Sequence, residues 1–387
     1  MVGAIIRTNS IDLPVKEDLI RIPPRKPEDR QEGYLARFDF HGIFSDVFFC
    51  DDSVIAVGPP YLNLLDSLSN ARFFLDEVEL SDPSAISFNE LNRTSRTKIQ
   101  LPCVGGSMVR PERLRVEFPS FAVECGVGAD QAAAFCDKNV LMTMSRDNPL
   151  LNISDWVRMN VVNNEIDAVL VYDNRSKDYS KKQLLEEIMS VEGVSVAVVV
   201  DWPHPYGVAA DSKQIWDSDF GQYSAWEDAR WRFLRKANSV MVGDCDEIPL
   251  VEDGVPCWKL AAETKSGVLY YRLRDVEPVR MGDAEGAGLR RHSDYNYYLE
   301  GRLASNKYTY IPSRLREDQQ LLVHAVTGAP DELPGKAYGR HFKALHRRWR
   351  DGSFGYTYSE RAKDESLSVD DVLSRAFRKA SLVPNER

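Results

Sequence analysis

Four short apolar runs separated by helix-forming segments constrain the fold of this chain more than any other feature. The runs cover residues 139–144, 168–172, 194–200 and 239–243, and each has the length and the apolar composition of a buried strand. Strands that alternate with helices are typical of a parallel sheet covered by helices on both faces. We therefore predict an α/β fold with a mostly parallel sheet for residues 137–350.

Helix-forming patterns fill the gaps between these runs. Ser154 and Ser180 are the predicted N-caps of the first two helices, because a serine hydroxyl accepts a hydrogen bond from a backbone N–H of the first turn. A third helix is expected over residues 222–236. The C-terminal residues 351–387 are predicted to form a helical tail, with an amphipathic helix capped by Ser368.

The first third of the chain has a different pattern. Short runs rich in β-branched and aromatic residues alternate with Pro, Gly, Asn and Asp, which favours strands joined by turns. Such runs cover residues 43–49, 53–57, 71–78, 97–101 and 114–121. We predict an N-terminal β-rich accessory domain over residues 1–136, with an irregular arm near residues 20–30.

Composition narrows the class of function. The chain has 49 Lys and Arg residues against 59 Asp and Glu, for a net charge of −10, so binding to nucleic acid is not expected. No apolar run reaches the roughly 18 residues of a membrane-spanning helix. The six cysteines form no CxxC pair, which favours reduced thiols in a cytoplasmic protein. A basic stretch at residues 340–350 fits a solvated helix face, peripheral contact with an anionic membrane, or contact with an acidic acceptor.

The predicted strands end in polar residues, which collect at one edge of the sheet. Asp244 and Asp246 follow the fourth run and are two positions apart, so in an extended chain both carboxylates point the same way. Like charges this close are costly unless a cation neutralises them. Mn²⁺ or Mg²⁺ with phosphate oxygens would fit. Asp217 and Asp219 repeat the pattern in a polar loop, which reads as a solvated turn.

A series of motifs in a fixed order gives a family resemblance. It runs through residues 142–147, Trp156, 171–178, 242–248, and the later segments 307–312, 323–324 and 341–343. In this order the chain resembles the nucleotide-sugar glycosyltransferases of the GT-A fold, closest to the family 2 and family 92 type. The resemblance covers residues 139–350. It implies a GT-A-like sheet sandwiched by helices, and family 92-like proteins also carry a β-rich region before the catalytic domain.

The resemblance also implies roles for individual residues. Ser145 and Arg146 would lie under the nucleotide base and ribose, and Asp173 with Asn174 would contact the base or ribose. Asp244 and Asp246 would hold the metal and the donor diphosphate. The remaining residues with implied roles are His324, which would complete the metal shell, and the diphosphate cations Lys307, Arg314 and Lys343.

Several of these residues have structural alternatives. Asp173 and Asn174 are also common turn formers after a strand. His324 follows an apolar run and equally fits a core histidine, and His341 lies in the basic stretch, which also fits a solvated helix face. His204 reads as loop structure, whereas His292 and His346 support no assignment.

The catalytic base is left open. The acceptor segment usual in the family after the Asp-x-Asp motif is not found here. An inverting transfer needs a carboxylate to take the proton of the attacking hydroxyl. Asp275, Asp294 and Glu300 are unranked candidates. Tyr295, Tyr297 and Tyr298 would either stack on a sugar or belong to a strand.

These observations favour a metal-dependent glycosyltransferase. It would move a sugar from a nucleotide donor, a UDP- or GDP-sugar, to a glycan or glycolipid hydroxyl in surface polysaccharide or glycoconjugate synthesis. Inversion at the anomeric carbon is implied by the resemblance alone. The alternatives are a nucleotidyltransferase, a phosphatase of the haloacid-dehalogenase kind, and a non-catalytic carbohydrate-binding protein with a degenerate site.

Overall fold

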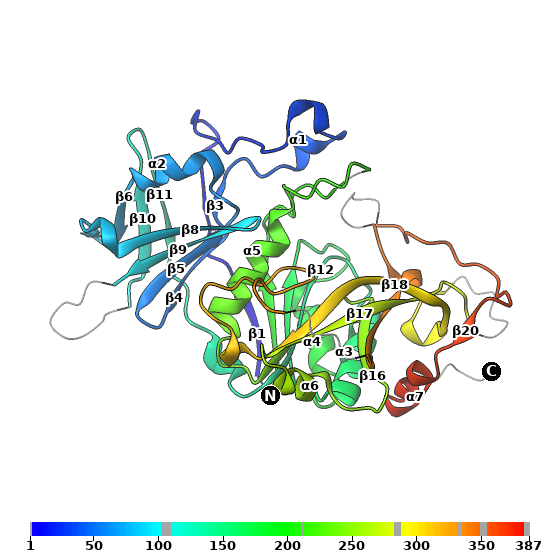
Figure 1. Ribbon diagram of the computed structural model, residues 1–387. Coiled ribbons are helices and arrows are strands. Elements are labelled where there is room, and N and C mark those ends of the chain that lie inside the picture. The colour runs from blue at the N-terminus through cyan, green and yellow to red at the C-terminus, as the bar shows by residue number, and fades with distance from the viewer. Residues whose placement is uncertain are drawn as a thin grey trace.

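The computed structural model describes residues 2–101, 110–210, 212–281, 288–330, 335–348 and 354–382. The predicted boundary at residues 350 and 351 and most of the Gly-rich turn at 282–288 lie outside these ranges. Two four-stranded β-sheets formed by the first third of the chain lie beside a large sheet flanked by helices (Figure 1).

The N-terminal part is β-rich, as predicted. One four-stranded sheet has the order β4-β5-β9-β8 and the other has the order β11-β10-β6-β7. The strands of the first are β4 (Asp46–Cys50), β5 (Ser53–Gly58), β8 (Ile86–Leu91) and β9 (Thr94–Gln100). Those of the second are β6 (Arg72–Leu75), β7 (Val78–Glu79), β10 (Arg113–Glu117) and β11 (Ala122–Gly126). One apolar cluster joins them, with Val54 and Ile99 from one sheet and Leu75 and Leu114 from the other.

Smaller elements complete this part of the chain. They are β2 (Ile11–Asp12), β3 (Gly42–Phe44), α1 (Tyr34–Arg37) and α2 (Leu65–Ser69). Strands β2 and β3 pair antiparallel. The predicted irregular arm lies before α1 and is anchored by Arg25, whose guanidinium lies 2.6 Å from Asp217 Oδ1.

The large sheet has the order β1-β14-β13-β12-β15-β18-β17-β19-β16, and β20 pairs with β18. Its early strands are β1 (Val2–Arg7), β12 (Asn139–Ser145), β13 (Ala168–Asp173), β14 (Val196–Asp201) and β15 (Ser239–Val242). Its later strands are β16 (Glu247–Val251), β17 (Val268–Val276), β18 (Tyr297–Tyr310), β19 (Ala337–Phe342) and β20 (Ser368–Val369). The five early strands are parallel, which confirms the predicted α/β class with a large, mostly parallel sheet.

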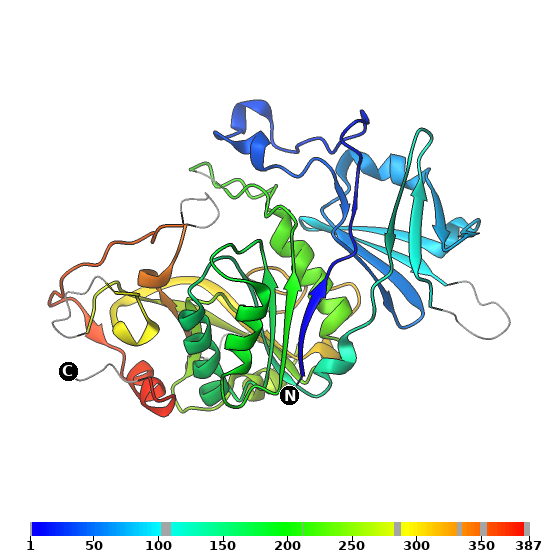
Figure 2. The ribbon, with the colours of Figure 1, turned by 180° about the vertical axis from the view of Figure 1, so that it is seen from behind.

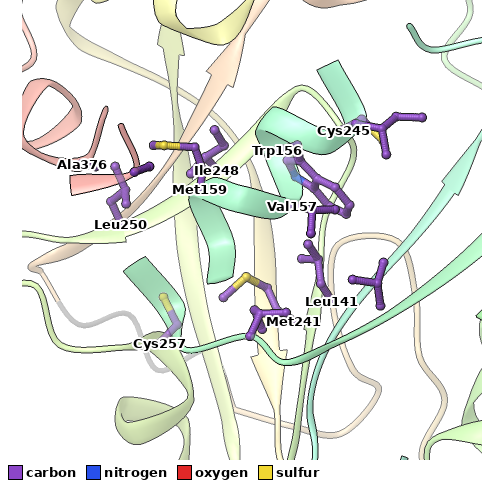
Figure 3. Close-up of a cluster of buried hydrophobic side chains, with 14 of the residues drawn as sticks. Leu141, Trp156, Val157, Met159, Met241, Cys245, Ile248, Leu250, Cys257 and Ala376 are labelled. Carbon is purple, nitrogen blue, oxygen red and sulfur yellow. The ribbon is translucent and has the colours of Figure 1, made fainter. Parts of the chain in front are cut away.

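Helices cover both faces of this sheet (Figure 2). They are α3 (Leu150–Asn164), α4 (Lys181–Met189), α5 (Phe220–Asp228), α6 (Cys257–Glu263) and α7 (Asp371–Lys379). Neighbouring strand residues point to opposite faces, so Leu141 packs with α3 and α4 whereas Val140 packs with α5. Figure 3 shows Trp156, Val157 and Met159 of α3 in the first of these clusters. None of the helices in the described ranges has the length and apolar composition to cross a membrane.

Strand β1 belongs to the large sheet, although the sequence analysis placed residues 1–136 together as one β-rich unit. It pairs in parallel with β14, from Val2 opposite Val196 to Arg7 opposite Asp201. Gly3 packs against α4, where side-chain atoms of Leu185 and Met189 lie within van der Waals reach of its Cα hydrogens. This pairing joins segments almost 200 residues apart, so a local sequence pattern cannot predict it.

The predicted helix starts were right once and wrong twice. Ser180 caps α4 in a capping box with Gln183, as expected from the sequence. Helix α3 begins at Leu150, so Ser154 lies inside it and donates to the Leu151 carbonyl. Helix α7 is capped by Asp370, which accepts from the Leu373 N–H, because Ser368 belongs to β20. The third predicted helix divides into α5 and a π-helical segment, Ala229–Phe233.

The strand order reverses between β12 and β15. From β12 the chain proceeds outward to β13 and β14 on one side, and then crosses to β15 on the other. In open α/β sheets the carboxyl ends of the two strands at such a reversal form the usual ligand crevice. Asp244 and Asp246 follow β15, and Ser145 ends β12, so the predicted site residues lie at this position.

Candidate metal centre

Three side chains of metal-ligating type meet beside this reversal. Asp246 lies in the turn between β15 and β16, His341 in β19, and His346 just after the 3-10 turn Lys343–Leu345. One potential ligand atom from each lies within 4.8 Å of the others. His346 Nδ1 is 3.0 Å and His341 Nε2 is 3.8 Å from Asp246 Oδ2. One carboxylate and two imidazoles thus converge on a common point.

Strand register brings these residues together. Strand β19 lies between β17 and β16, so His341 is opposite Asp275 on one side and Glu247 on the other. The Phe342 N–H donates to the Asp246 carbonyl at 2.8 Å and ties β19 to the Asp-x-Asp turn. The later half of the sheet therefore returns the histidines to the end of β15.

Buried side chains hold the turn itself in place. Trp156 Nε1 donates to the Glu247 carbonyl at 2.8 Å, and His292 Nε2 lies 2.9 Å from the Cys245 carbonyl. Burial lowers the pKa of His292 and so favours the neutral ring, which can donate to that carbonyl through Nε2–H. His292, to which the sequence assigned no role, thus supports the turn that carries Asp246.

The electrostatics of the cluster favour ion pairing. Burial opposes the charged form of His341, but the hydrogen bond that its ring donates to Asp275 and the charge of Asp246 outweigh burial and raise the pKa of His341 to about 9. Burial also opposes ionisation of Asp246, but the hydrogen bond with His346 and the charge of His341 hold its pKa well below the usual range. At neutral pH the carboxylate of Asp246 is therefore ionised and lies beside a positively charged His341.

Asp244 has a different partner from Asp246. Lys307 Nζ lies 3.0 Å from Asp244 Oδ2 and 3.3 Å from Glu247 Oε2, with the lysine side chain only 1% exposed. The backbone N–H of Asp244 also donates to Glu247 Oε2 at 3.0 Å. Burial raises the pKa of Glu247 to about 7, although Lys307 opposes this rise. In this structure a lysine lies beside one carboxylate and histidines lie beside the other, and binding of one cation by both Asp244 and Asp246 stays a prediction.

His324, expected to complete the metal shell, lies outside the cluster. Its side chain is exposed, and its Nδ1 is 2.8 Å from the Asn306 carbonyl. Among the residues that the structure describes, the metal-ligating group contains His341 and His346 instead. The sequence analysis had given His346 no role. The only sequence feature that could have pointed to it as a ligand is its place five positions after His341.

The other two expected diphosphate cations are placed apart from Asp244. Strand β18 is antiparallel to β15, with Val242 opposite Tyr308 and Val240 opposite Tyr310. Arg314, which follows Tyr310, therefore lies toward the opposite end of β15 and donates to the Thr264 carbonyl at 2.9 Å. The register of β18 with β15 therefore places Arg314 away from the position predicted for the diphosphate. Lys343 lies near the cluster but pairs with Glu277 Oε1 at 2.9 Å.

The carboxyl ends of β12 and β13 lie next to the end of β15 in the sheet. Ser145 Oγ accepts from Asn148 Nδ2 at 2.9 Å, and the Arg146 guanidinium lies 5.0 Å from the Phe354 ring centre. Asp173 is 1% exposed, burial raises its pKa, and Lys181 Nζ lies 3.5 Å from it. These residues are adjacent in the sheet, because Ser145 is the register partner of Asp173.

Asn174 is fixed by the backbone around it. Its N–H donates to the Ser145 carbonyl at 2.8 Å, and its Nδ2 donates to the carbonyls of Trp202 and His204 at 3.0 and 2.9 Å. Both side-chain donors are therefore used to join the ends of β13 and β14. This contact set favours the structural alternative for Asn174. His204 is also held in the loop, as expected, with its Nε2 3.2 Å from Thr8 Oγ1.

The three candidate bases differ in their surroundings. Asp275 Oδ1 lies 2.8 Å from His341 Nδ1, so this carboxylate belongs to the cluster. Asp294 pairs with Arg280 at 2.9 Å, and Glu300 is exposed on β18. Tyr295 is buried, whereas Tyr297 and Tyr298 are half-buried and lie under the cations of Lys363 and Arg274.

Comparison with known proteins adds no family assignment. No protein-family model matches this sequence, and no curated protein matches it either. What the site can do therefore rests on its own geometry.

The cysteines that the structure describes are free thiols, in line with the expectation from their spacing. They are Cys50, Cys125, Cys136, Cys245 and Cys257.

Proposed function

We propose that this chain is a metal-dependent glycosyltransferase of GT-A-like fold. It transfers a sugar from a nucleoside diphosphate donor, a UDP- or GDP-sugar, to a hydroxyl of a glycan or glycolipid. The observation that carries the proposal is the meeting of Asp246, His341 and His346 beside the reversal of strand order. The ordered motif series in the sequence supports it independently.

The donor atoms of the cluster fit a divalent ion. A carboxylate oxygen with two imidazole nitrogens suits Mn²⁺ and other first-row transition ions, whereas Mg²⁺ prefers oxygen ligands alone. Asp246, His341 and His346 would hold the ion, and when bound it neutralises charge on the leaving diphosphate. Of the two metals named from the sequence, Mn²⁺ accepts imidazole nitrogen more readily than Mg²⁺ does, which supports manganese in this proposal.

Other residues of the crevice have roles that do not depend on the ion. Lys307 holds the Asp244 carboxylate in place and brings a buried positive charge to the diphosphate side of the site. Arg146 and Asp173 line the ends of β12 and β13, where the nucleoside would lie. With Asp275 bound to His341 and Asp294 bound to Arg280, Glu300 is the candidate base with an exposed carboxylate.

Donor turnover tests the proposal. The purified chain is incubated with Mn²⁺ and a panel of UDP- and GDP-sugars, and release of nucleoside diphosphate is measured for wild type, D246A and D253A. Asp253 is exposed and pairs with Lys336 far from the crevice, so D253A controls for the loss of one carboxylate. We expect turnover in wild type and D253A, and a loss of at least about 100-fold in D246A.

Two results would contradict the proposal. Equal turnover by wild type and D246A would remove the cluster from the reaction. Release of pyrophosphate in place of nucleoside diphosphate would assign nucleotidyl transfer, which uses the same metal and nucleotide. A thermal-shift screen of UDP and GDP with Mn²⁺ narrows the donor beforehand, because a ligand that binds the folded state raises the melting temperature.

A further inference from the structure

We propose that Asp275 is a positioning residue of the metal centre, where it holds His341 in the tautomer that presents Nε2 to the ion. The inference rests on the proposed metal-dependent function and deepens it. It also gives Asp275 a role different from the proton transfer considered from the sequence. Three observations carry it: a hydrogen bond, the direction of the opposite ring nitrogen, and the strands that hold the pair.

The hydrogen bond fixes which nitrogen carries the proton. His341 Nδ1 lies 2.8 Å from Asp275 Oδ1, and an ionised carboxylate only accepts hydrogen bonds. Nδ1 must therefore be the protonated nitrogen, and in the neutral ring the lone pair lies on Nε2. A metal takes this lone pair, so the carboxylate selects the ligating atom.

The other ring nitrogen, Nε2, faces the rest of the cluster. His341 Nε2 lies 3.8 Å from Asp246 Oδ2, whereas Nδ1 is the nitrogen bound to Asp275. An ion held by Asp246 would therefore be within reach of Nε2 and not of Nδ1. Carboxylate–histidine–metal arrangements of this kind orient the ring and raise its basicity as a ligand.

Regular secondary structure holds the pair rigidly. Asp275 in β17 and His341 in β19 are direct partners in a parallel ladder, between the pairs Arg274–Arg340 and Val276–Phe342. A hydrogen bond between side chains on neighbouring strands does not depend on a loop. The ring of His341 is therefore oriented before any ion arrives, which lowers the cost of binding.

His346 provides a contrast within the same cluster. Its Nδ1 lies 3.0 Å from Asp246, so its partner is itself a potential ligand. The ring follows a 3-10 turn and is 41% exposed, whereas His341 is 17% exposed. His341 is therefore the preorganised ligand of the two, because Asp275 fixes its ring.

Manganese binding to the full chain tests the inference. Free Mn²⁺ is measured by its electron paramagnetic resonance signal during titration of wild type, D275A, D275N and the control D253A, with the metal alone as ligand. We expect D275A to weaken Mn²⁺ binding by about 10- to 100-fold. D275N should lose less, because its carboxamide oxygen still accepts from Nδ1–H, and D253A should bind as wild type does.

The partial rescue by asparagine separates orientation from general damage. Thermal melting of each variant identifies any that fails to fold, and D275N preserves the shape of the side chain if D275A does fail. Equal Mn²⁺ affinity of wild type and the Asp275 variants would overturn the inference and leave the proposed function intact. Absence of Mn²⁺ binding by wild type would instead overturn the metal-dependent function, and this inference with it.

Discussion

The carboxylate of Asp246 and the imidazole of His346 lie 3.0 Å apart, although 100 residues separate them in the chain. Between them the chain forms strands β16 to β19 of the large sheet, and β19 returns to the Asp246 turn, which places both residues at one edge. The site therefore depends on a fully formed sheet. Substitutions at this edge should affect metal binding more than those at nearby exposed histidines.

Replacement of His346 tests which histidines belong to the metal centre. H346A should weaken Mn²⁺ binding by at least about 10-fold, because one of the potential ligands is removed. H324A is the matched control, since His324 is exposed and faces the Asn306 carbonyl. Titration monitored by the signal of free Mn²⁺ measures both. Loss of binding in H324A but not in H346A would restore the ligand set expected from the sequence.

Lys307 gives a prediction about stability. It is the buried cation between Asp244 and Glu247, and removal of one partner of a buried ion pair costs about 3–5 kcal/mol. K307M should lower the free energy of unfolding in urea by that order. The control K336M removes an exposed lysine paired with Asp253 and should change it little. Equal losses in the two variants would show that the buried ion pair stabilises the fold no more than the exposed pair does.

The interface between the N-terminal sheets and α5 gives a prediction about pH. Asp46 of β4 and Asp228 of α5 are both buried, with Arg232 paired to Asp46 and Tyr172 donating to Asp228 at 2.6 Å. Burial and then the charge of Asp46 raise the pKa of Asp228 well above its usual value, although Arg232 opposes this. The folded chain therefore keeps a proton here that the unfolded chain loses above about pH 4.

The sign of the effect follows from linkage. A raised carboxyl pKa means that the folded state binds more protons, so its stability falls as pH rises. D228N cannot ionise in either state and should become more stable relative to wild type as pH rises from about 5 to about 8, by up to roughly 1.4 kcal/mol per pH unit. Urea unfolding at several pH values measures this. The exposed Asp66 provides the control D66N, and an identical pH profile for D228N and wild type would refute the prediction.

The parts of the fold set by local pattern were predictable from the sequence. The strands β12, β13 and β15 were predicted within two residues, because short apolar runs between turn-forming residues report burial directly. Ser180 was recognised as a cap because it stands directly before a segment whose apolar residues have helical spacing. These features depend on residues that are neighbours in the chain.

The rest depends on contacts between distant segments. β1 joins the sheet through β14, and His346 reaches Asp246 through the return of β19, and neither pairing leaves a local signal. Arg314 was misplaced for the same reason, since only the antiparallel register of β18 shows which end of the sheet it occupies. Residue types at the edge were therefore predictable, whereas their partners were not.

The start of α7 gives the last prediction. Asp370 accepts from the Leu373 N–H at 2.9 Å and pairs with Arg340 at 2.9 Å, while Arg340 itself is 1% exposed and adjacent to His341. D370A removes the cap and leaves a buried guanidinium unpaired, so unfolding in urea should show a loss of about 3–5 kcal/mol. D370N keeps a cap acceptor and should lose less. S368A tests the cap expected from the sequence and should change stability little, because Ser368 lies in β20. A larger loss in S368A than in D370A would mean that the helix begins where the sequence pattern had placed it.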